Sequence, residues 1–329
     1  MSGLQFNNPF NGTALLVLIL TIQGCAVLTP SQVNAVGDFA LAAENYSELP
    51  SAVIDLHIQS MFAENVYASA SISDPGSAAA KMSKDVDVFL NSLHTSARAD
   101  SALNVIDGYV KLLTKLSSSD FTQRLEEETE ILATEIDGGV SQYNEVSGED
   151  LEGFGAAVAE IVRAGGGVFI RYKQAEALKE AVIGAEPIMH KMAASVTDLM
   201  DLYICGAVDE NGVCVVDDDG QQFPGFGELV ETGLVDEYQG LLTSGLGNKS
   251  IRDVEIFNEL LLKAKSIKPL AKRTRQAMRT FQAAHTKLYD KLQESQTLEG
   301  KIEEIIMLYG EIKSAQRFRN TIESQNISR

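Results

Sequence analysis

The chain has no tryptophan, and aromatic residues make up only 7% of its 329 positions. Proline is also scarce, with seven residues, while Ala, Leu, Glu and Ser are abundant. This balance favours helices over a β sandwich. The length is sufficient to bury a sizeable core, either as one elongated domain or as two compact ones.

Local catalytic motifs are missing as well. The four histidines, His57, His94, His190 and His285, do not have a metal-ligand spacing such as H-E-x-x-H. The chain has no G-x-S-x-G elbow and no glycine-rich loop ending in Gly-Lys-Ser or Gly-Lys-Thr. We therefore predict a non-enzymatic protein without a cofactor, although a site assembled from distant helices would leave no local signal.

The chain also lacks the excess of positive charge that a general nucleic-acid binder needs, since its net charge is −19. Residues 251–329 are the exception, with 15 Lys and Arg against 10 Asp and Glu. The tightest basic stretch contains no acidic residue and comprises Lys263, Lys265, Lys268, Lys272, Arg273, Arg275 and Arg279. It is either a contact for acidic lipid, lipopolysaccharide phosphate or a partner, or a helix face that complements neighbouring acidic helices. We favour the second interpretation.

The N-terminal region has only a short hydrophobic run. Its apolar block, Ala14 to Ile22, is too short for a transmembrane helix, which needs about 20 residues, but it has the length of a signal-peptide h-region. The block ends in Ile22-Gln23-Gly24-Cys25, with an aliphatic residue at minus three and a small residue at minus one from the cysteine.

These four residues resemble the lipobox of bacterial lipoproteins. The resemblance implies that residues 1–24 are a removed signal peptide, and that Cys25 carries the lipid and begins a mature domain spanning residues 25–329. Because Ala26 is not Asp, the resemblance also implies the outer membrane of a diderm bacterium, in contact with the periplasm or the cell surface. The alternative is an ordinary buried helix with a free cysteine, but Gly24, Thr29 and Pro30 would interrupt it.

The lipoprotein interpretation leaves Cys205 and Cys214 as an even pair in an oxidising compartment, so we expect a disulfide. It would close a non-helical segment, residues 204–227, in which Asn211-Gly212 predicts a small β hairpin. Clustered acidic residues make this segment a weak calcium candidate, with ligands Asp209, Asn211, Asp217 and Asp219. Because no complete calcium loop is present, we favour a solvated acidic loop and expect no metal.

Most of the remaining chain has helical periodicity. Thr29, Pro30 and Gln32 form a capping-box pattern, and separate helices are predicted around residues 86–97, 103–116 and 121–146. A four-three alternation from Leu260 to Leu292 continues through Pro269 and includes His285 as a hydrogen-bonded core residue. A last antiparallel helix follows residue 298. The predicted fold is an all-α, elongated antiparallel bundle with long, partly kinked helices and one β-hairpin-like excursion.

The segment from Gly153 to Ile170 contains only two charged residues, Glu160 and Arg163. Such a segment is similar to the membrane-inserting hairpins of helical pore-forming toxins, and the two charges could pair across one helix face. A central, fully buried bundle helix is the interpretation that we favour.

These features together predict a lipid-anchored structural or protein-interaction module of the cell envelope. Its partners would be the membrane, through Cys25, and an envelope protein. The alternatives are a membrane-active protein that deploys Gly153 to Ile170 and a ligand-binding protein with a site between helices.

Overall fold

The computed structural model describes residues 28–118, 123–164, 170–209, 213–217, 219–245, 250–293 and 302–327. This part of the chain is all-α, as predicted. The helices are α2 (Pro30–Ala43), α3 (Glu48–Ala70), α4 (Pro75–Ser117), α5 (Gln123–Ser147), α6 (Gly155–Arg163), α7 (Ile170–Ile204), α8 (Phe226–Thr243), α9 (Ile251–Gln293) and α10 (Glu303–Ile327). None of them is both long and apolar enough to cross a membrane.

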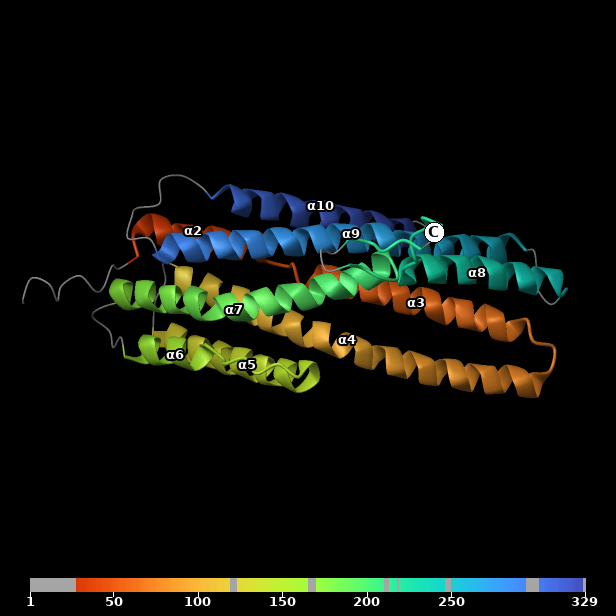
Figure 1. Cartoon of the computed structure of the whole chain (residues 1–329), viewed down its shortest axis with the longest axis horizontal. Coiled ribbons are helices and arrows are strands. Elements are labelled where there is room, and N and C mark those ends of the chain that lie inside the picture. Colours follow the sequence, from red (N-terminus) through yellow and green to blue (C-terminus); the bar gives the residue numbers. More distant parts are fainter. Residues whose placement is uncertain are drawn as a thin grey trace, which may run out of the picture.

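The helices lie along one long axis and form an elongated bundle (Figure 1). Helices α4 and α9 each contain 43 residues, which corresponds to a length of about 65 Å. Two pairs of consecutive helices, α2 with α3 and α7 with α8, run in the direction opposite to α4 and α9 (Figure 1). Helix α10 then packs along α9, while α5 and α6 lie beside α4 and α7. The predicted elongated, antiparallel bundle is therefore confirmed.

Helix α2 begins where the sequence predicts. The Thr29 hydroxyl accepts a hydrogen bond from the Gln32 backbone N–H at 3.3 Å, and Gln32 Oε1 accepts from the Thr29 N–H at 2.8 Å. This capping box satisfies two backbone donors that the first helical turn would otherwise leave unpaired. Leu28 is already buried in the main core, so the chain is fixed to the bundle from the first described residue onward.

The helices around residues 86–97 and 103–116 were predicted to be separate, and this prediction is wrong. Both belong to the single helix α4, because no glycine or proline interrupts residues 98–102. Pro269 lies within the C-terminal segment, where a proline can divide one helix into two. Helix α9 continues through this proline, as the unbroken apolar periodicity predicted.

Three hydrophobic clusters fill the described part of the bundle. The largest lies between α2, α4, α5, α6, α7, α9 and α10, and it includes the rings of Phe39, Tyr109 and Phe281. A second cluster surrounds Tyr203 and Cys205 at the end of α7. The third cluster lies where α3 meets α8 and α9, and it contains few buried residues. The ring of Tyr238 stacks on the ring of Phe257 at this cluster. The core is therefore thickest in the half that contains α2.

The segment around α6 is not the fully buried central helix that was predicted. Helix α6 has only nine residues and buries one face, so its other face is exposed. The long buried helix is α7 instead. Arg163 does not pair with Glu160 but with Glu130 of α5, at 2.8 Å. The small residues allow close packing on α5: a Cβ on Gly155 would collide with the carbonyl of Ala133. Residues 165–169 lie outside the described residues.

Asp137 of α5 provides the N-terminal cap of α6. Its two carboxylate oxygens accept hydrogen bonds from the backbone N–H groups of Gly155 and Ala156, each at 2.8 Å. A carboxylate at this position satisfies unpaired donors and interacts favourably with the helix dipole. The link also holds Phe154, which is buried in the main core.

Replacing Asp137 by alanine should therefore lower the free energy of unfolding by about 1–2 kcal/mol. Urea unfolding measures this loss, and hydrogen exchange should accelerate at the amides of Gly155 and Ala156. Thr134→Ala on the same helix is the control, because its exposed hydroxyl bonds only within α5. Equal losses in the two variants would contradict the capping role of Asp137.

Candidate functional site

The predicted lipid-attachment site lies next to the described bundle but not within it. Residues 22–25, including Cys25, are outside the described residues. Leu28 is buried, and only Ala26 and Val27 separate it from Cys25. A lipid on Cys25 would therefore sit close to the first turn of α2. In that turn, the Gln32 amide donates to the carbonyl of Lys291 at 3.1 Å, which fixes the C-terminal end of α9 to the same place.

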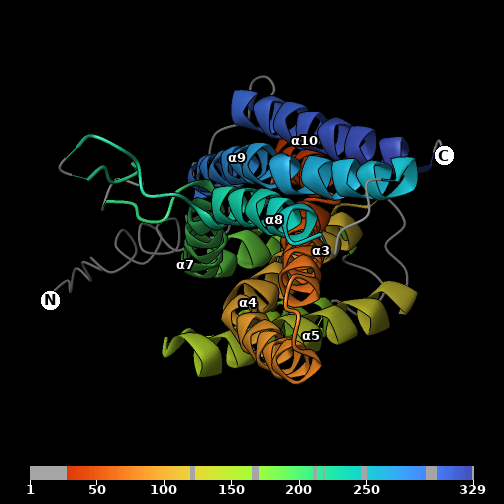
Figure 2. The ribbon, with the colours of Figure 1, turned by 90° about the vertical axis from the view of Figure 1, so that its right-hand side faces the viewer.

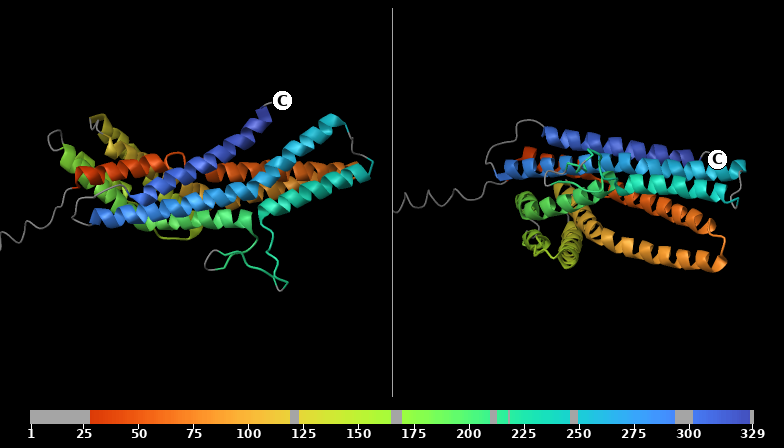
Figure 3. Two further views of the ribbon diagram at one scale, coloured as in Figure 1. Left: turned by 90° about the horizontal axis from the view of Figure 1, so that it is seen from above. Right: turned by 45° about the vertical axis from the view of Figure 1, so that its right-hand side comes forward.

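The predicted disulfide is present. Cys205 and Cys214 are bonded, with their Cα atoms 5.9 Å apart. Cys205 is buried at the end of α7, so the bond attaches the following segment to the bundle. Figure 2 shows this segment projecting sideways from the helices, and Figure 3 shows the same projection from above.

The predicted β hairpin is not supported. Among the described residues of this segment the backbone makes only three isolated antiparallel bridges, Cys205 with Pro224, Val208 with Cys214 and Val216 with Gln222, and no strand. Acidic side chains hold the turns instead: Asp209 accepts from the Val213 N–H at 2.9 Å. Side-chain bonds of this kind compete with a regular ladder.

The side chain of a second calcium candidate, Asp217, is engaged in the same way. Asp217 accepts the N–H groups of Asp219 at 3.0 Å and Gln221 at 2.8 Å. Asn211 is outside the described residues. Within the described chain, no group of three or more acidic, histidine or cysteine side chains could hold a metal ion. The carboxylates of Asp209 and Asp217 therefore act as turn formers in the part of the segment that the structure describes.

His285 is the buried, hydrogen-bonded core residue that its place in the apolar stripe predicted. Its Nδ1 lies 2.6 Å from a carboxylate oxygen of Glu186, and its Nε2 lies 2.7 Å from the Tyr109 hydroxyl. Since a carboxylate only accepts, Nδ1 donates to Glu186, and in the tautomer with its single proton on Nδ1 the ring accepts the Tyr109 O–H at Nε2. Thr286 donates to the second oxygen of Glu186 at 3.0 Å.

The electrostatics of this network follow from burial and hydrogen bonding. Burial raises the pKa of Tyr109 well above its ordinary value, and the nearby charge of Glu186 adds to this. Burial would also raise the pKa of Glu186. The hydrogen bonds and charge interactions with His285, the bond from Thr286 and the charge of His190 outweigh burial and hold this pKa below its ordinary value. Tyr109 is therefore neutral, and Glu186 is charged, at pH 7.

A hydroxyl, an imidazole and a carboxylate in this order can activate a nucleophile in an enzyme. Here the arrangement lies inside the bundle. The Tyr109 side chain is fully buried, and the rings of Phe39, Phe281 and Phe154 pack around it and His285. The Tyr109 hydroxyl is enclosed in this packed core, so its hydrogen bond with His285 contributes to the stability of the fold.

Most of the predicted basic residues are used within the bundle. Four of them pair with carboxylates: Lys263 with Glu259 (3.1 Å), Lys265 with Glu231 (3.6 Å), Lys268 with Glu228 (2.8 Å) and Arg275 with buried Asp201. Arg273 donates to the Ser314 hydroxyl at 2.7 Å and lies over the ring of Phe318. Lys272 and Arg279 are exposed and, unlike Arg273, have neither an ion pair nor a side-chain hydrogen bond with a described residue.

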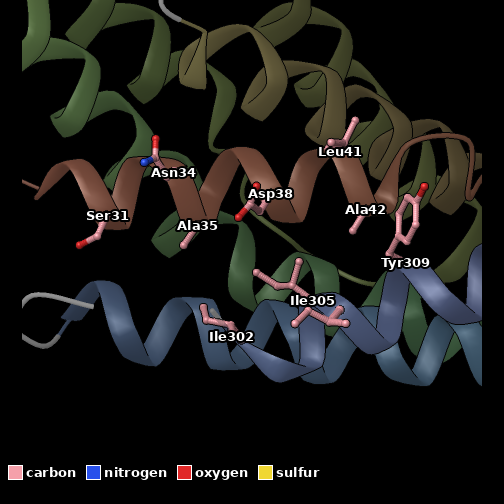
Figure 4. Close-up of a pocket in the computed structure, with 10 residues that line it drawn as sticks. Ser31, Asn34, Ala35, Asp38, Leu41, Ala42, Ile302, Ile305 and Tyr309 are labelled. Atoms are coloured by element: carbon pink, nitrogen blue, oxygen red, sulfur yellow. The ribbon is translucent and has the colours of Figure 1, made fainter. Parts of the chain in front are cut away.

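A groove of about 390 Å³ lies between α2 and α10. Ile302 and Ile305 form its apolar floor and are only 8% and 6% exposed. Ile302, just before α10, and Ile305, in its first turn, extend toward Ala35 and Asp38 of α2 (Figure 4). Three apolar side chains border the groove at the surface, Leu41, Ile306 and Tyr309, and each is at least half exposed. Ser31 lines the groove near the start of α2, so one end of it lies close to the predicted anchor.

No sequence pattern indicated this groove directly. The apolar residues Ile302, Ile305, Tyr309 and Ile312 recur at helical spacing as one stripe, which predicts burial, but the Tyr309 side chain is 50% exposed. The one signal in the sequence was Ile306, an apolar residue beside that stripe rather than within it. Such a residue widens the apolar face of a helix beyond what one neighbour covers.

No protein-family model, curated protein sequence or solved structure matches this chain.

Proposed function

We propose that this protein is a lipid-anchored, non-enzymatic interaction module of the bacterial cell envelope, and that the α2–α10 groove is its contact surface for a partner protein. The groove is the observation that carries the proposal. It combines a buried isoleucine floor, exposed apolar side chains at Leu41, Ile306 and Tyr309, and a polar wall that includes Asp38. Protein interfaces commonly join an apolar centre to a polar rim in this way.

The position of the groove supports the anchored part of the proposal. Ser31 follows Cys25 by six residues, and Leu28 is already packed in the core. Three acyl chains on Cys25 would hold the protein durably at a membrane, whereas one chain gives only marginal binding. The resemblance of residues 22–25 to a lipobox, with Ala26 after the cysteine, supports an anchor in the outer membrane of a diderm bacterium.

The membrane-active alternative finds no specific support. Phe154, Val158 and Val162 are buried in the main core, and Asp137 caps α6 from α5. Deployment of this segment would break these contacts.

Mass spectrometry of the N-terminus tests the anchor. The protein purified from a bacterial host should begin at Cys25 and carry the mass of the lipid, while the Cys25→Ser variant should lack that mass. An intact chain from Met1 with an unmodified thiol would overturn the lipid proposal.

Photocrosslinking in cells tests the groove. A photoreactive amino acid at Leu41 should form a discrete crosslinked product, and the additional substitution Ile306→Asp should remove it. The matched control places the same photoreactive residue at Ile131, which is 58% exposed on α5, away from the groove. Identical products from both positions would show that the crosslinks do not report on the groove.

A further inference from the structure

Helix α9 has two faces of different character. Its core face is apolar from Ala264 to Leu292. The opposite, exposed face consists of Lys265, Pro269, Lys272, Gln276, Arg279, Ala283, Lys287 and Asp290. At 100° per residue these positions fall within one narrow arc of the helix. This face therefore carries four cations and one anion, although the chain has a net charge of −19.

The basic side chains of α9 differ in what they contact. Three that lie off this arc, Lys263, Lys268 and Arg275, form ion pairs with carboxylates of the bundle. A fourth, Arg273, donates a hydrogen bond to Ser314 and lies over the ring of Phe318. Three cations within the arc, Lys272, Arg279 and Lys287, are exposed and have no ion-pair partner among the described residues. We call these three residues the cationic stripe. Lys265 lies on the same face of the helix as the cationic stripe, but it forms an exposed ion pair with Glu231 at 3.6 Å. An exposed ion pair of this kind contributes little to stability.

The stripe lacks the apolar anchors of a protein interface. The exposed large apolar residues of α9 are Ile251, Val254 and Ile256, all within its first two turns. Between the cations lie only Gln276 and Ala283 on the exposed arc. Protein interfaces draw most of their binding energy from buried aromatic and apolar side chains. A surface of phosphate groups requires only spaced cations, so it is the better match.

The stripe is also placed suitably for a membrane. Lys272 and Lys287 are 15 positions apart, a distance of about 22 Å along the helix. Lys287 lies one turn before Lys291, whose carbonyl accepts the hydrogen bond from Gln32 in the first turn of α2. The stripe thus begins beside the proposed anchor and runs along the bundle.

We propose that the cationic stripe binds the anionic headgroups of a phospholipid membrane and lays the bundle along that surface. The proposal rests on the anchor of the proposed function only for proximity. A tether at Cys25 keeps the stripe near the bilayer, where its local concentration is high. Each Lys or Arg near an anionic surface changes the bound-to-free ratio by about fivefold. Three such residues would change it by about a hundredfold.

A chemically attached anchor tests the stripe without relying on biological acylation. Cys205 and Cys214 are disulfide-bonded, so Cys25 is the remaining thiol of a chain with three cysteines. The protein from Cys25 onward is coupled through this thiol to a maleimide lipid in vesicles. One vesicle set is phosphatidylcholine, and the other contains equal parts phosphatidylcholine and phosphatidylglycerol, each with brominated acyl chains.

Because the chain contains no tryptophan, the fluorescence of a single introduced tryptophan reports on its own position. The tryptophan of an Ala283→Trp variant, within the exposed arc, should be quenched by the brominated lipids in anionic vesicles and much less in neutral ones. The tryptophan of an Ile131→Trp variant, on α5, should be quenched in neither. Adding the triple substitution K272Q, R279Q and K287Q to the Ala283→Trp variant should abolish its quenching in anionic vesicles.

A matched triple, K84Q, K179Q and R252Q, removes the same charge from other surfaces and should leave the quenching unchanged. Circular dichroism should show that both triples remain helical. Equal effects of the two triples would overturn the proposal, because total charge would then explain the binding. Equal quenching at positions 283 and 131, or none at 283, would also overturn it. A native Cys25 that is not acylated would contradict the proposed function without changing this result.

Discussion

Replacing His285 by leucine should lower the free energy of unfolding by about 3 kcal/mol. Leucine fills most of the volume of the imidazole, so the loss comes mainly from polar groups. The hydroxyl of Tyr109 is fully buried and would lose its partner at 2.7 Å. Glu186 would lose the donor at 2.6 Å that helps to keep its carboxylate charged. Urea unfolding followed by circular dichroism measures this loss.

The double variant Tyr109→Phe with His285→Leu provides the decisive comparison. Tyr109→Phe alone should cost about 1 kcal/mol, since it removes one hydrogen bond. In the double variant no hydroxyl is left unpaired beside position 285, so stability should exceed that of His285→Leu alone. Losses that simply add would show that the Tyr109–His285 hydrogen bond does not couple the two residues.

The position of His285 illustrates how far the sequence alone can predict this structure. The four-three repeat of α9 placed His285 on the buried face, and most buried polar side-chain groups form hydrogen bonds. The partners themselves were not predictable. Glu186 and Tyr109 are 99 and 176 positions away in the chain. Their proximity depends on how α4 and α7 pack on α9, for which the sequence contains no local signal.

Long amphipathic helices were predictable because each repeats its signal over many turns. Helix α9 continued through Pro269, and the Thr29 cap set the start of α2. Short-range signals performed less well. Asn211-Gly212 predicted a hairpin, yet Asp209 and Asp217 bond the nearby backbone in place of a regular ladder. The scarcity of charged residues near α6 predicted a fully buried helix, but α6 buries only one face, which packs closely on α5.

The α2–α10 groove shows the same limitation for the candidate site. Its walls come from opposite ends of the chain, around Ala35 and Ile305. Each helix by itself has an ordinary apolar face, and neither pattern indicates how completely the other covers it. The charges of α9 were more informative, since helical geometry alone separates Lys272 and Arg279 from the inward-facing Arg275. That Arg275 pairs with Asp201 became clear only from the packing of α7 on α9.

His57 should make the protein less stable as the pH falls from 7 to 5. Its ring packs against Tyr203 and Phe226, with centroids 5.1 and 5.8 Å away. Its Nδ1 is buried without a hydrogen-bond partner among the described residues. Burial lowers the pKa of His57 from 6.5 to about 4. Between these values the unfolded chain binds a proton that the folded chain does not, so stability is lost as the pH falls. The loss by pH 5 is about 2 kcal/mol.

The His57→Phe variant should lack this loss, because phenylalanine keeps the ring contacts but does not titrate. The difference in unfolding free energy between variant and wild type should therefore increase by about 2 kcal/mol between pH 7 and pH 5. Glu186 does not mask the effect. Its lowered pKa gives stability that is complete above the ordinary carboxyl value of 4.5 and is lost only at lower pH. His190→Gln, on an exposed part of α7, is the control. A constant difference across this pH range would show that His57 is protonated equally in the folded and unfolded states.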